Sequence, residues 1–278
     1  MRKNVQGIDH AVFAVRDLDV ARETFERMGF TLTPRGHHTL GSQNHCVVFG
    51  DDYLELLWLP PDLKTRPFIA DFLERGEGLA ALALKTGDAD AAHAELRAAA
   101  LEPTTPMDFS RPVHFPGGTR DARFRTLDIG ADHVPCGRLF LCQHQTPELV
   151  WRPEWQEHDN GATALAAVAV IATDVAATAK TYEKIFGTRA RKIAEGLLVE
   201  TGGAPIAVVT QGSLVRRLPR VGISARHAPM MAAVFIRVGD RNRAHQRLSR
   251  GGFCPLRMPD GSVAIGAAEA HGAALVFG

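Results

Sequence analysis

The sequence has few cysteines and spaces them widely. The four in the chain are Cys46, Cys136, Cys142 and Cys254, and no two form a C-x-x-C pair. This spacing excludes the paired-cysteine zinc and thioredoxin motifs, and it is typical of a protein in the reducing cytoplasm. We expect these cysteines to behave as small buried hydrophobic residues.

Long hydrophobic runs and an excess of charge are also missing. No stretch approaches the roughly 18 apolar residues that a transmembrane helix needs, and the early charged residues argue against a signal peptide. Lys and Arg total 32 and Asp and Glu total 31, which gives a net charge of +1. So balanced a chain has no electrostatic basis for binding nucleic acid or an anionic membrane. The expected partner is a small molecule.

Nucleotide-binding and serine-hydrolase motifs are absent as well, since the chain contains no GxGxxG string, no P-loop and no GxSxG elbow. The overall composition is that of a globular protein. The chain has 278 residues, of which 45% are hydrophobic and 23% are charged. This length and balance predict two domains of ordinary size with buried cores.

A fourfold repeat organises the chain. Each repeat reads as a short apolar strand, an aspartate, a helix with apolar residues three and four apart, and a closing segment rich in glycine. The aspartates are Asp17, Asp88, Asp174 and Asp240. An aspartate carboxylate can cap the free N–H groups at a helix start, and glycine readily adopts the left-handed conformation just beyond a helix end.

Strand-forming segments follow each helix, so the repeating unit is βαβββ. In the first unit a predicted hairpin turn at 50–52 joins two strands, and in the second unit we expect strands at 102–107, 123–128 and 138–144. The sequence therefore predicts an α+β fold of four tandem units. Two units form an N-terminal domain at residues 1–155 and two form a C-terminal domain at residues 160–278.

This arrangement resembles the vicinal oxygen chelate superfamily, and more narrowly its glyoxalase-like-domain group. The resemblance rests on Gly7–His10 followed by Asp17, on Tyr53–Leu56, and on the stretch Leu141–Trp151. It implies that the units pair and curl into two half-barrel cups. It also implies a divalent metal on the concave face of a cup, held by residues of the first and last strands of each unit.

Carried over by position, the resemblance implies a metal site made of His10, Glu55 and His144. The fourth family position falls near Ala81, which cannot bind a metal. Two imidazoles and one carboxylate can form a facial triad with open coordination positions, and the ion would be Fe, Mn, Zn or Ni. Glu55 lies in an apolar strand, where a lone carboxylate needs a partner or a metal. It is also the candidate proton acceptor of the reaction.

Other histidines are weaker candidates. His45 is a candidate catalytic residue because its strand borders the cup, and Glu148 competes with His144 for the ligand position. His158 is favoured as a residue that structures the linker, and whether it or Glu148 joins the site stays open. The adjacent His38 is expected in an exposed loop with His37.

The C-terminal domain lacks the candidate metal ligands of the N-terminal domain. Ala167 and Ala233 stand where His10 stands in the first unit, and the last strand has no glutamate. The resemblance therefore implies a degenerate C-terminal cup without a metal site of its own.

The resemblance also implies a type of reaction. Superfamily reactions develop negative charge on adjacent substrate oxygens, which a divalent ion stabilises as a Lewis acid. The leading hypothesis is a metal-dependent lyase or isomerase that acts on a small oxygenated molecule. Alternatives are an Fe(II) ring-cleaving extradiol-type dioxygenase and a non-catalytic protein that sequesters a toxic aromatic compound or antibiotic. Exposed sheet edges are also compatible with a homodimer.

Overall fold

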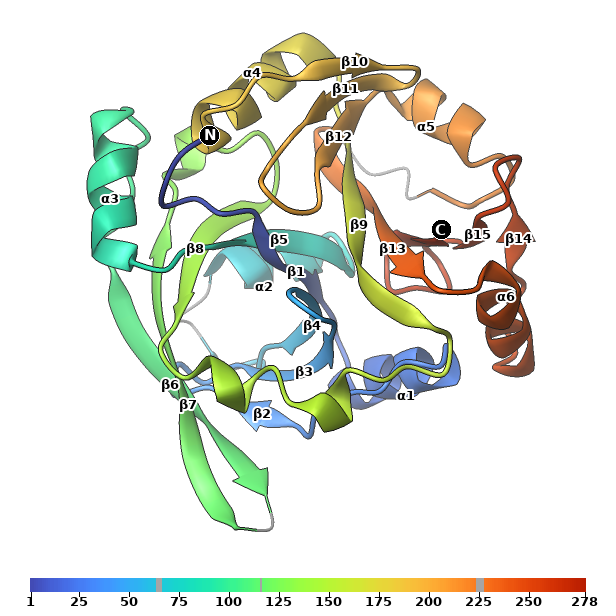
Figure 1. Ribbon diagram of the computed structural model, residues 1–278, viewed down its shortest axis with the longest axis horizontal. Coiled ribbons are helices and arrows are strands. Elements are labelled where there is room, and N and C mark those ends of the chain that lie inside the picture. Colours follow the sequence, from blue (N-terminus) through green and yellow to red (C-terminus); the bar gives the residue numbers. More distant parts are fainter. Residues whose placement is uncertain (64–66, 116, 224–227) are drawn as a thin grey trace.

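The strands of the computed structural model form two eight-stranded sheets (Figure 1). The structure describes residues 1–63, 67–115, 117–223 and 228–278. The N-terminal sheet consists of β1 (Ile8–Ala14), β2 (Gly36–His37), β3 (Gln43–Val48), β4 (Tyr53–Trp58), β5 (Gly78–Lys85), β6 (Met107–Phe115), β7 (Gly118–Asp128) and β8 (Arg138–His144). The C-terminal sheet consists of β9 (Ala162–Ile171), β10 (Arg191–Ile193), β11 (Gly196–Val199), β12 (Ile206–Val209), β13 (Met230–Val238), β14 (Leu256–Arg257), β15 (Val263–Ile265) and β16 (Ala274–Phe277).

The two sheets have the same topology. Their strand orders are β2-β3-β4-β1-β5-β8-β7-β6 and β10-β11-β12-β9-β13-β16-β15-β14. The first strand of each unit is followed by a helix, and these helices are α1 (Leu18–Arg27), α3 (Ala89–Ala98), α4 (Val175–Phe186) and α6 (Arg241–Arg250). The predicted α+β fold of four βαβββ units paired into two cups is confirmed.

The helix signals also lie where the sequence placed them. Asp17, Asp88, Asp174 and Asp240 are the N-cap residues, and each carboxylate accepts a backbone N–H of the first helical turn. Helix α4 ends at Gly187 in the left-handed conformation, with φ +64°.

Two elements between the units were not expected. Helix α2 (Pro67–Glu74) connects the first unit to the second, and α5 (Gln211–Arg217) connects the third to the fourth. Each packs its apolar residues over the open face of one cup, Ile69 in the N-terminal cup and Leu214 in the C-terminal cup.

The first of the three later strands in unit two was predicted at the wrong place. The expectation was 102–107, whereas β6 occupies Met107–Phe115 and forms a long hairpin with β7. Strand β6 lies at the edge of the sheet and contains Pro112, which an edge strand tolerates because the missing N–H faces away from the partner strand.

Side-chain alternation gives each sheet two different faces. In β1, Ala11 and Phe13 belong to one large core that both sheets share with the four repeat helices, whereas Val12 and Ala14 face the N-terminal cup. The cups therefore lie on the faces of the sheets away from the shared core. No helix among the described residues is long and apolar enough to cross a membrane.

The N-terminal sheet nearly closes into a barrel. The N–H of Thr39, just beyond β2, donates to the carbonyl of Ser110 in β6 at 2.9 Å, and the N–H of Ser110 donates to Thr39 Oγ1 at 3.2 Å. These bonds join the two edges of the sheet and bring β6 beside the first unit.

The linker after β8 runs across the molecule to β9 (Figure 1) and is anchored by His158. Its Nδ1 accepts the Thr31 N–H at 3.0 Å and its Nε2–H donates to the Val48 carbonyl at 3.1 Å. The rings of Phe30 and Phe49 pack edge-on against the imidazole. This is the linker-structuring role that the sequence favoured.

His158 should make the free energy of unfolding depend on pH. Burial lowers the pKa of His158 to about 4, whereas an unfolded histidine titrates near 6.5. Between these values the unfolded chain binds more protons, so stability is complete above about pH 6.5 and falls toward pH 4, by up to about 3 kcal/mol. Urea unfolding of wild type and His158→Gln from pH 4 to 8 should show a difference that shrinks as the pH falls. A constant difference would contradict this account.

Candidate active site

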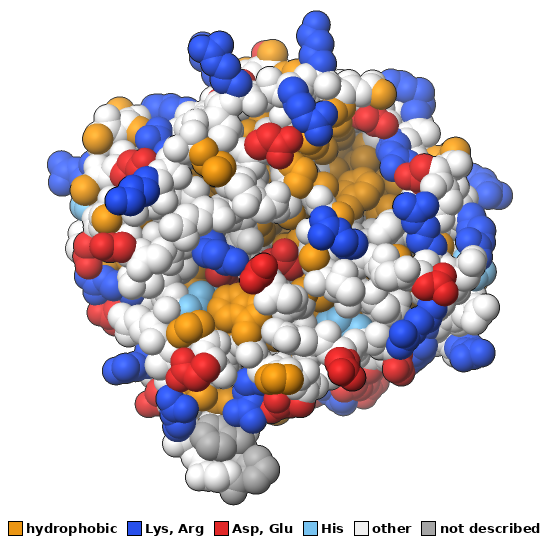
Figure 2. All heavy atoms as spheres, viewed as in Figure 1, with side chains coloured by type: hydrophobic (Ala, Val, Ile, Leu, Met, Phe, Trp, Pro, Cys, Tyr) orange, Lys and Arg blue, Asp and Glu red, His pale blue; other side chains and the backbone are white. Residues whose placement is uncertain are grey.

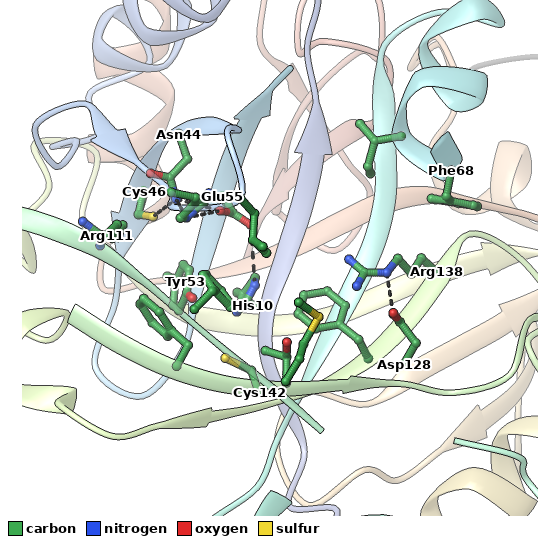
Figure 3. A pocket seen from close by; sticks show the side chains of 18 of the residues that line it. His10, Asn44, Cys46, Tyr53, Glu55, Phe68, Arg111, Asp128, Arg138 and Cys142 are labelled. Carbon is green, nitrogen blue, oxygen red and sulfur yellow. Dashed lines mark hydrogen bonds and ion pairs between the residues drawn. The ribbon is translucent and has the colours of Figure 1, made fainter. Parts of the chain in front are cut away.

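A pocket of about 500 Å³ occupies the concave face of the N-terminal sheet. Strand alternation directs His10 of β1 and both Tyr53 and Glu55 of β4 into it (Figure 3). Strands β1 and β4 are parallel neighbours, which places Tyr53 opposite His10 and Glu55 opposite Val12. The remaining wall is mainly apolar and aromatic. It contains Leu40, Cys46, Pro67, Phe68, Ile69, Met107, Phe109, Phe124, Phe140 and Cys142.

His10 is oriented by the residue before it. Its Nδ1 lies 2.7 Å from Oδ1 of Asp9, which is completely buried. Neighbours in a regular strand point to opposite faces, but the pairing of β1 with β5 shifts between Ile8 and His10. An irregularity of this kind re-aims a side chain, which explains how Asp9 and His10 meet. An ionised carboxylate only accepts, so the Nδ1–H of His10 donates and its Nε2 lone pair faces the pocket.

His144 contacts the same carboxylate from β8. Its Nε2 lies 3.0 Å from Asp9 Oδ1, and its ring packs against Trp151 and Phe124. Burial opposes ionisation of Asp9, but the attraction of His144 and His10 in their protonated forms, together with the hydrogen bonds from both rings, outweighs it and holds the pKa of Asp9 well below its usual range. The structure thus joins His144 to His10 through Asp9, behind the pocket.

Glu55 faces Nε2 of His10 across the pocket floor. Its Oε2 lies 3.6 Å from that nitrogen, and its Oε1 accepts a hydrogen bond from Asn44 Nδ2 at 2.6 Å (Figure 3). Nε2 of His38 lies 3.9 Å from Oε1. His38 is buried and lines the pocket, although the sequence suggested an exposed loop.

His45 and Glu148 are not brought into the pocket. In β3, Asn44 and Cys46 face the cup, so His45 between them points to the other side and its Nδ1 lies 2.7 Å from the Thr33 carbonyl. Burial lowers the pKa of His45. Glu148 is exposed and forms an ion pair with Arg120 at 2.8 Å.

The second unit contributes a different kind of wall. Ala83 of β5 pairs with His10, and Phe140 of β8 pairs with Ala83. The metal ligand that the sequence lacks near Ala81 is therefore not replaced at these paired positions on this half of the cup, where Phe140 and Cys142 line the pocket. Burial, together with the negative charges of Asp9 and Glu55, raises the pKa of the Cys142 thiol well above its usual value.

Two groups of side chains can be tested as metal ligands. Asp9, Cys142 and His144 place one donor atom each within 4.8 Å of one another, but only Cys142 of the three lines the pocket. An ion held there would therefore have only one of its three ligands in the pocket lining.

The second group faces the pocket and contains His10, Glu55 and His38. Two ligands about 2.1 Å from one ion lie roughly 3.0 to 3.4 Å apart, close to the 3.6 Å between His10 Nε2 and Glu55 Oε2. A carboxylate behind a ligating imidazole, as Asp9 stands behind His10, is the usual second-layer support of a metal-binding histidine. The spacing of His10 and Glu55 suits a divalent ion, and Nε2 of His38 lies 3.9 Å from Glu55 Oε1. Among the described residues, however, His38 does not form a group with His10 and Glu55 whose donor atoms all lie within 4.8 Å of one another.

Charge is mixed on the face of the molecule that Figure 2 displays. Figure 2 shows acidic and basic side chains interspersed over the face it displays, and a hollow lined by hydrophobic side chains on the side of the C-terminal sheet. The open face of that sheet is apolar among the described residues, with Ile171, Val209, Leu214 and Val276 in its cluster.

Comparisons with known proteins agree with the fold. A family model described as a glyoxalase-like domain matches residues 8–186. No curated protein matches the chain.

Solved structures that resemble the chain include a hypothetical protein from Staphylococcus aureus, with 15% identity, a TM-score of 0.70 and 98% of each chain covered. A mutant 4-hydroxymandelate synthase from Streptomyces coelicolor has 20% identity and a TM-score of 0.61, over 92% of this chain and 78% of that one. A fusion of a xylose isomerase-like TIM barrel with a 4-hydroxyphenylpyruvate dioxygenase has 14% identity and a TM-score of 0.59, over 98% of this chain and 49% of that one.

The double hydrogen bond to Asp9 should make this carboxylate important for stability. Asp9→Asn removes the charge that accepts from His10 and His144, so we expect it to lower the free energy of unfolding by about 3 kcal/mol. Asp17→Asn is the matched control, because asparagine is an equally good helix N-cap. Urea unfolding at pH 7 compares the two variants, and equal small losses would contradict the role given to Asp9.

Proposed function

Since the chain belongs to the glyoxalase-like domain family, within the vicinal oxygen chelate superfamily, we propose that it is a divalent-metal-dependent enzyme. The proposed reaction is of the lyase or isomerase type, on a small oxygenated molecule bound in the N-terminal cup. We propose His10 and Glu55 as metal ligands, and His38, whose Nε2 lies 3.9 Å from Glu55 Oε1, as a further imidazole that supports metal binding.

The observation that carries the proposal is the chain of contacts from Asp9 through His10 to Glu55. The 2.7 Å contact between Asp9 and His10 Nδ1 commits that nitrogen to donating, so Nε2 is left as a lone-pair donor toward Glu55 at 3.6 Å. A histidine needed only for packing would not require a buried carboxylate that fixes its tautomer. In this proposal His144 holds Asp9 in place, and His45 has no part.

The protein side chains divide the chemical work. A divalent ion, when bound, supplies Lewis-acid stabilisation of negative charge on adjacent substrate oxygens. Asn44 holds Oε1 of Glu55, so that Oε2 is the oxygen that would bind the ion or, in a step in which it is free of the ion, accept a proton beside a substrate carbonyl. The aromatic wall formed by Phe109, Phe124 and Phe140 excludes water and strengthens electrostatic interactions inside the cup.

A non-catalytic binding protein is the second candidate. Its support is the apolar half of the cup around Ala83, Phe140 and Cys142, which offers contact area to a hydrophobic compound. This candidate requires tight binding without turnover and no metal.

Metal analysis separates these candidates. Protein purified without added metal or chelator should contain about one equivalent of divalent metal, and His10→Ala should lose it because the oriented Nε2 donor is gone. Glu55→Gln should weaken it. The matched pair is His38→Ala, expected to reduce binding, and His37→Ala, expected to leave it unchanged because His37 is exposed. Elemental analysis by mass spectrometry provides the measurement.

The identity of the metal narrows the reaction. Bound iron would support the ring-cleaving dioxygenase instead, provided that the protein consumes oxygen. Exposure to air should then abolish this activity, and Fe(II) with a reductant should restore it. Metal retained in His10→Ala but lost in His144→Ala would move the site to the group of Asp9, Cys142 and His144. No metal in any preparation, and none taken up on reconstitution, would sink the metal-dependent proposal.

A further inference from the structure

Arg111 is a buried cation that the proposed chemistry does not use. It lies in β6, lines the same pocket as His10 and Glu55, and is only 4% exposed. Within the described part of the chain no hydrogen bond or ion pair of its guanidinium is found. In Figure 3 it lies beside Asn44 and Cys46, and no interaction is drawn to it.

The other arginine of the pocket provides a direct contrast. Arg138 Nε lies 2.5 Å from Oδ1 of Asp128, and its guanidinium packs 4.4 Å from the centre of the Phe140 ring. Figure 3 shows this pair on the opposite side of the pocket from Arg111. The charge of Arg138 is therefore directly paired, whereas Arg111 has no such paired carboxylate among the described residues.

A buried, uncompensated charge is costly, and proteins rarely keep one without a use for it. Arginine remains protonated even when buried, so it cannot avoid this cost by losing its proton. A guanidinium in a low-dielectric pocket is, however, a strong and specific binder of carboxylates, which it engages through two parallel hydrogen bonds.

The fold holds Arg111 at this place. The bonds between Thr39 and Ser110 fix β6 against the first unit. Gly36 lets the side chains come close, because a Cβ there would lie 2.3 Å from Asn44 Oδ1 and 3.0 Å from Arg111 Cδ. Asn44 commits its amide N–H to Glu55, and its Oδ1 is buried without a partner among the described residues. This end of the pocket thus presents a cation and a hydrogen-bond acceptor.

The wall next to Arg111 suits a flat apolar group. The rings of Phe109 and Phe124 stack at 5.0 Å and both line the pocket, as do Phe68 and Phe140. Aromatic side chains pack well on planar rings. A volume of about 500 Å³ falls in the range of pockets for small organic molecules.

We propose that the N-terminal cup binds a small carboxylic acid with an aromatic body, whose carboxylate is held by Arg111. This carboxylate is separate from the oxygens that face His10 and Glu55. The inference deepens the proposed function by naming the substrate class, and it rests on that function only for the claim that the bound acid is a substrate. Binding of the acid itself requires Arg111 and the aromatic wall.

The test compares phenylacetate with phenylacetamide, its neutral isostere, by calorimetric titration of the whole chain at pH 7 after metal removal with EDTA. Wild type should bind phenylacetate about tenfold more tightly or better, because a charge-assisted double hydrogen bond is lost in the amide. Arg111→Met should abolish this preference and leave phenylacetamide binding unchanged. Arg111→Lys should keep only part of the preference, since an ammonium group cannot make the planar double contact.

Arg138→Gln is the matched control, because its charge is already paired with Asp128, and it should keep the preference. Thermal unfolding adds a second readout: Arg111→Met should unfold at or above the wild-type temperature, since it removes an uncompensated buried charge. Equal binding of both probes by wild type would overturn the proposal. So would an equal loss of preference in Arg138→Gln, or a lower unfolding temperature of Arg111→Met with equal loss of both probes. Because metal is absent from these titrations, their result is independent of the metal analysis above.

Discussion

The buried carboxylate of Asp9 is the interaction on which the candidate site depends. It accepts from His10, in the first unit, and from His144, in the last strand of the second unit. Inside a protein such a charge is stable only while its donors stay in place. The same two bonds therefore tie the units together, fix the tautomer of His10 and direct its Nε2 toward Glu55. The Asp9 carboxylate therefore both positions His10 in the site and stabilises the contact between the two units of the cup.

Polar groups are distributed unevenly between the two cups. The N-terminal cup contains His10, Glu55 and Arg111 among aromatic side chains, whereas the described residues of the C-terminal cluster are apolar. Positions equivalent to His10 are alanines in the third and fourth units, where Ala167 is half-buried and Ala233 is buried. The other face of the C-terminal sheet packs in the core that both sheets share, and it supports the N-terminal sheet there.

The sequence predicted the architecture well because the relevant signals are local. Each unit carries its own apolar strand, its aspartate cap and its turn residues, and these act within a few residues of one another. The resemblance to the superfamily singled out His10 and Glu55 as candidates in the cup, and both line the pocket. Their placement on one face of the sheet follows from a period of two and needs no knowledge of distant contacts.

The rest of the site depended on information that a sequence pattern does not carry. The facing of His45 could not be assigned because a shift of one residue reverses the face of a strand. The role of Asp9 follows from an irregular pairing of β1 with β5. His38 and Arg111 reach the pocket only because β2 and β6 come together at the barrel seam. Helices α2 and α5 were missed because they lie outside the repeat.

The strand order has a consequence for how the protein acquires its shape. The first strand of each sheet lies at its centre, between a parallel partner from its own unit and an antiparallel partner from the next. Neither partner is adjacent in sequence, so long loops must close before the central strand gains its hydrogen bonds, and chain entropy opposes that closure. The seam between Thr39 and Ser110 closes a loop of similar length. Folding should therefore be slow for a chain of this size, with the pocket among the last features to form.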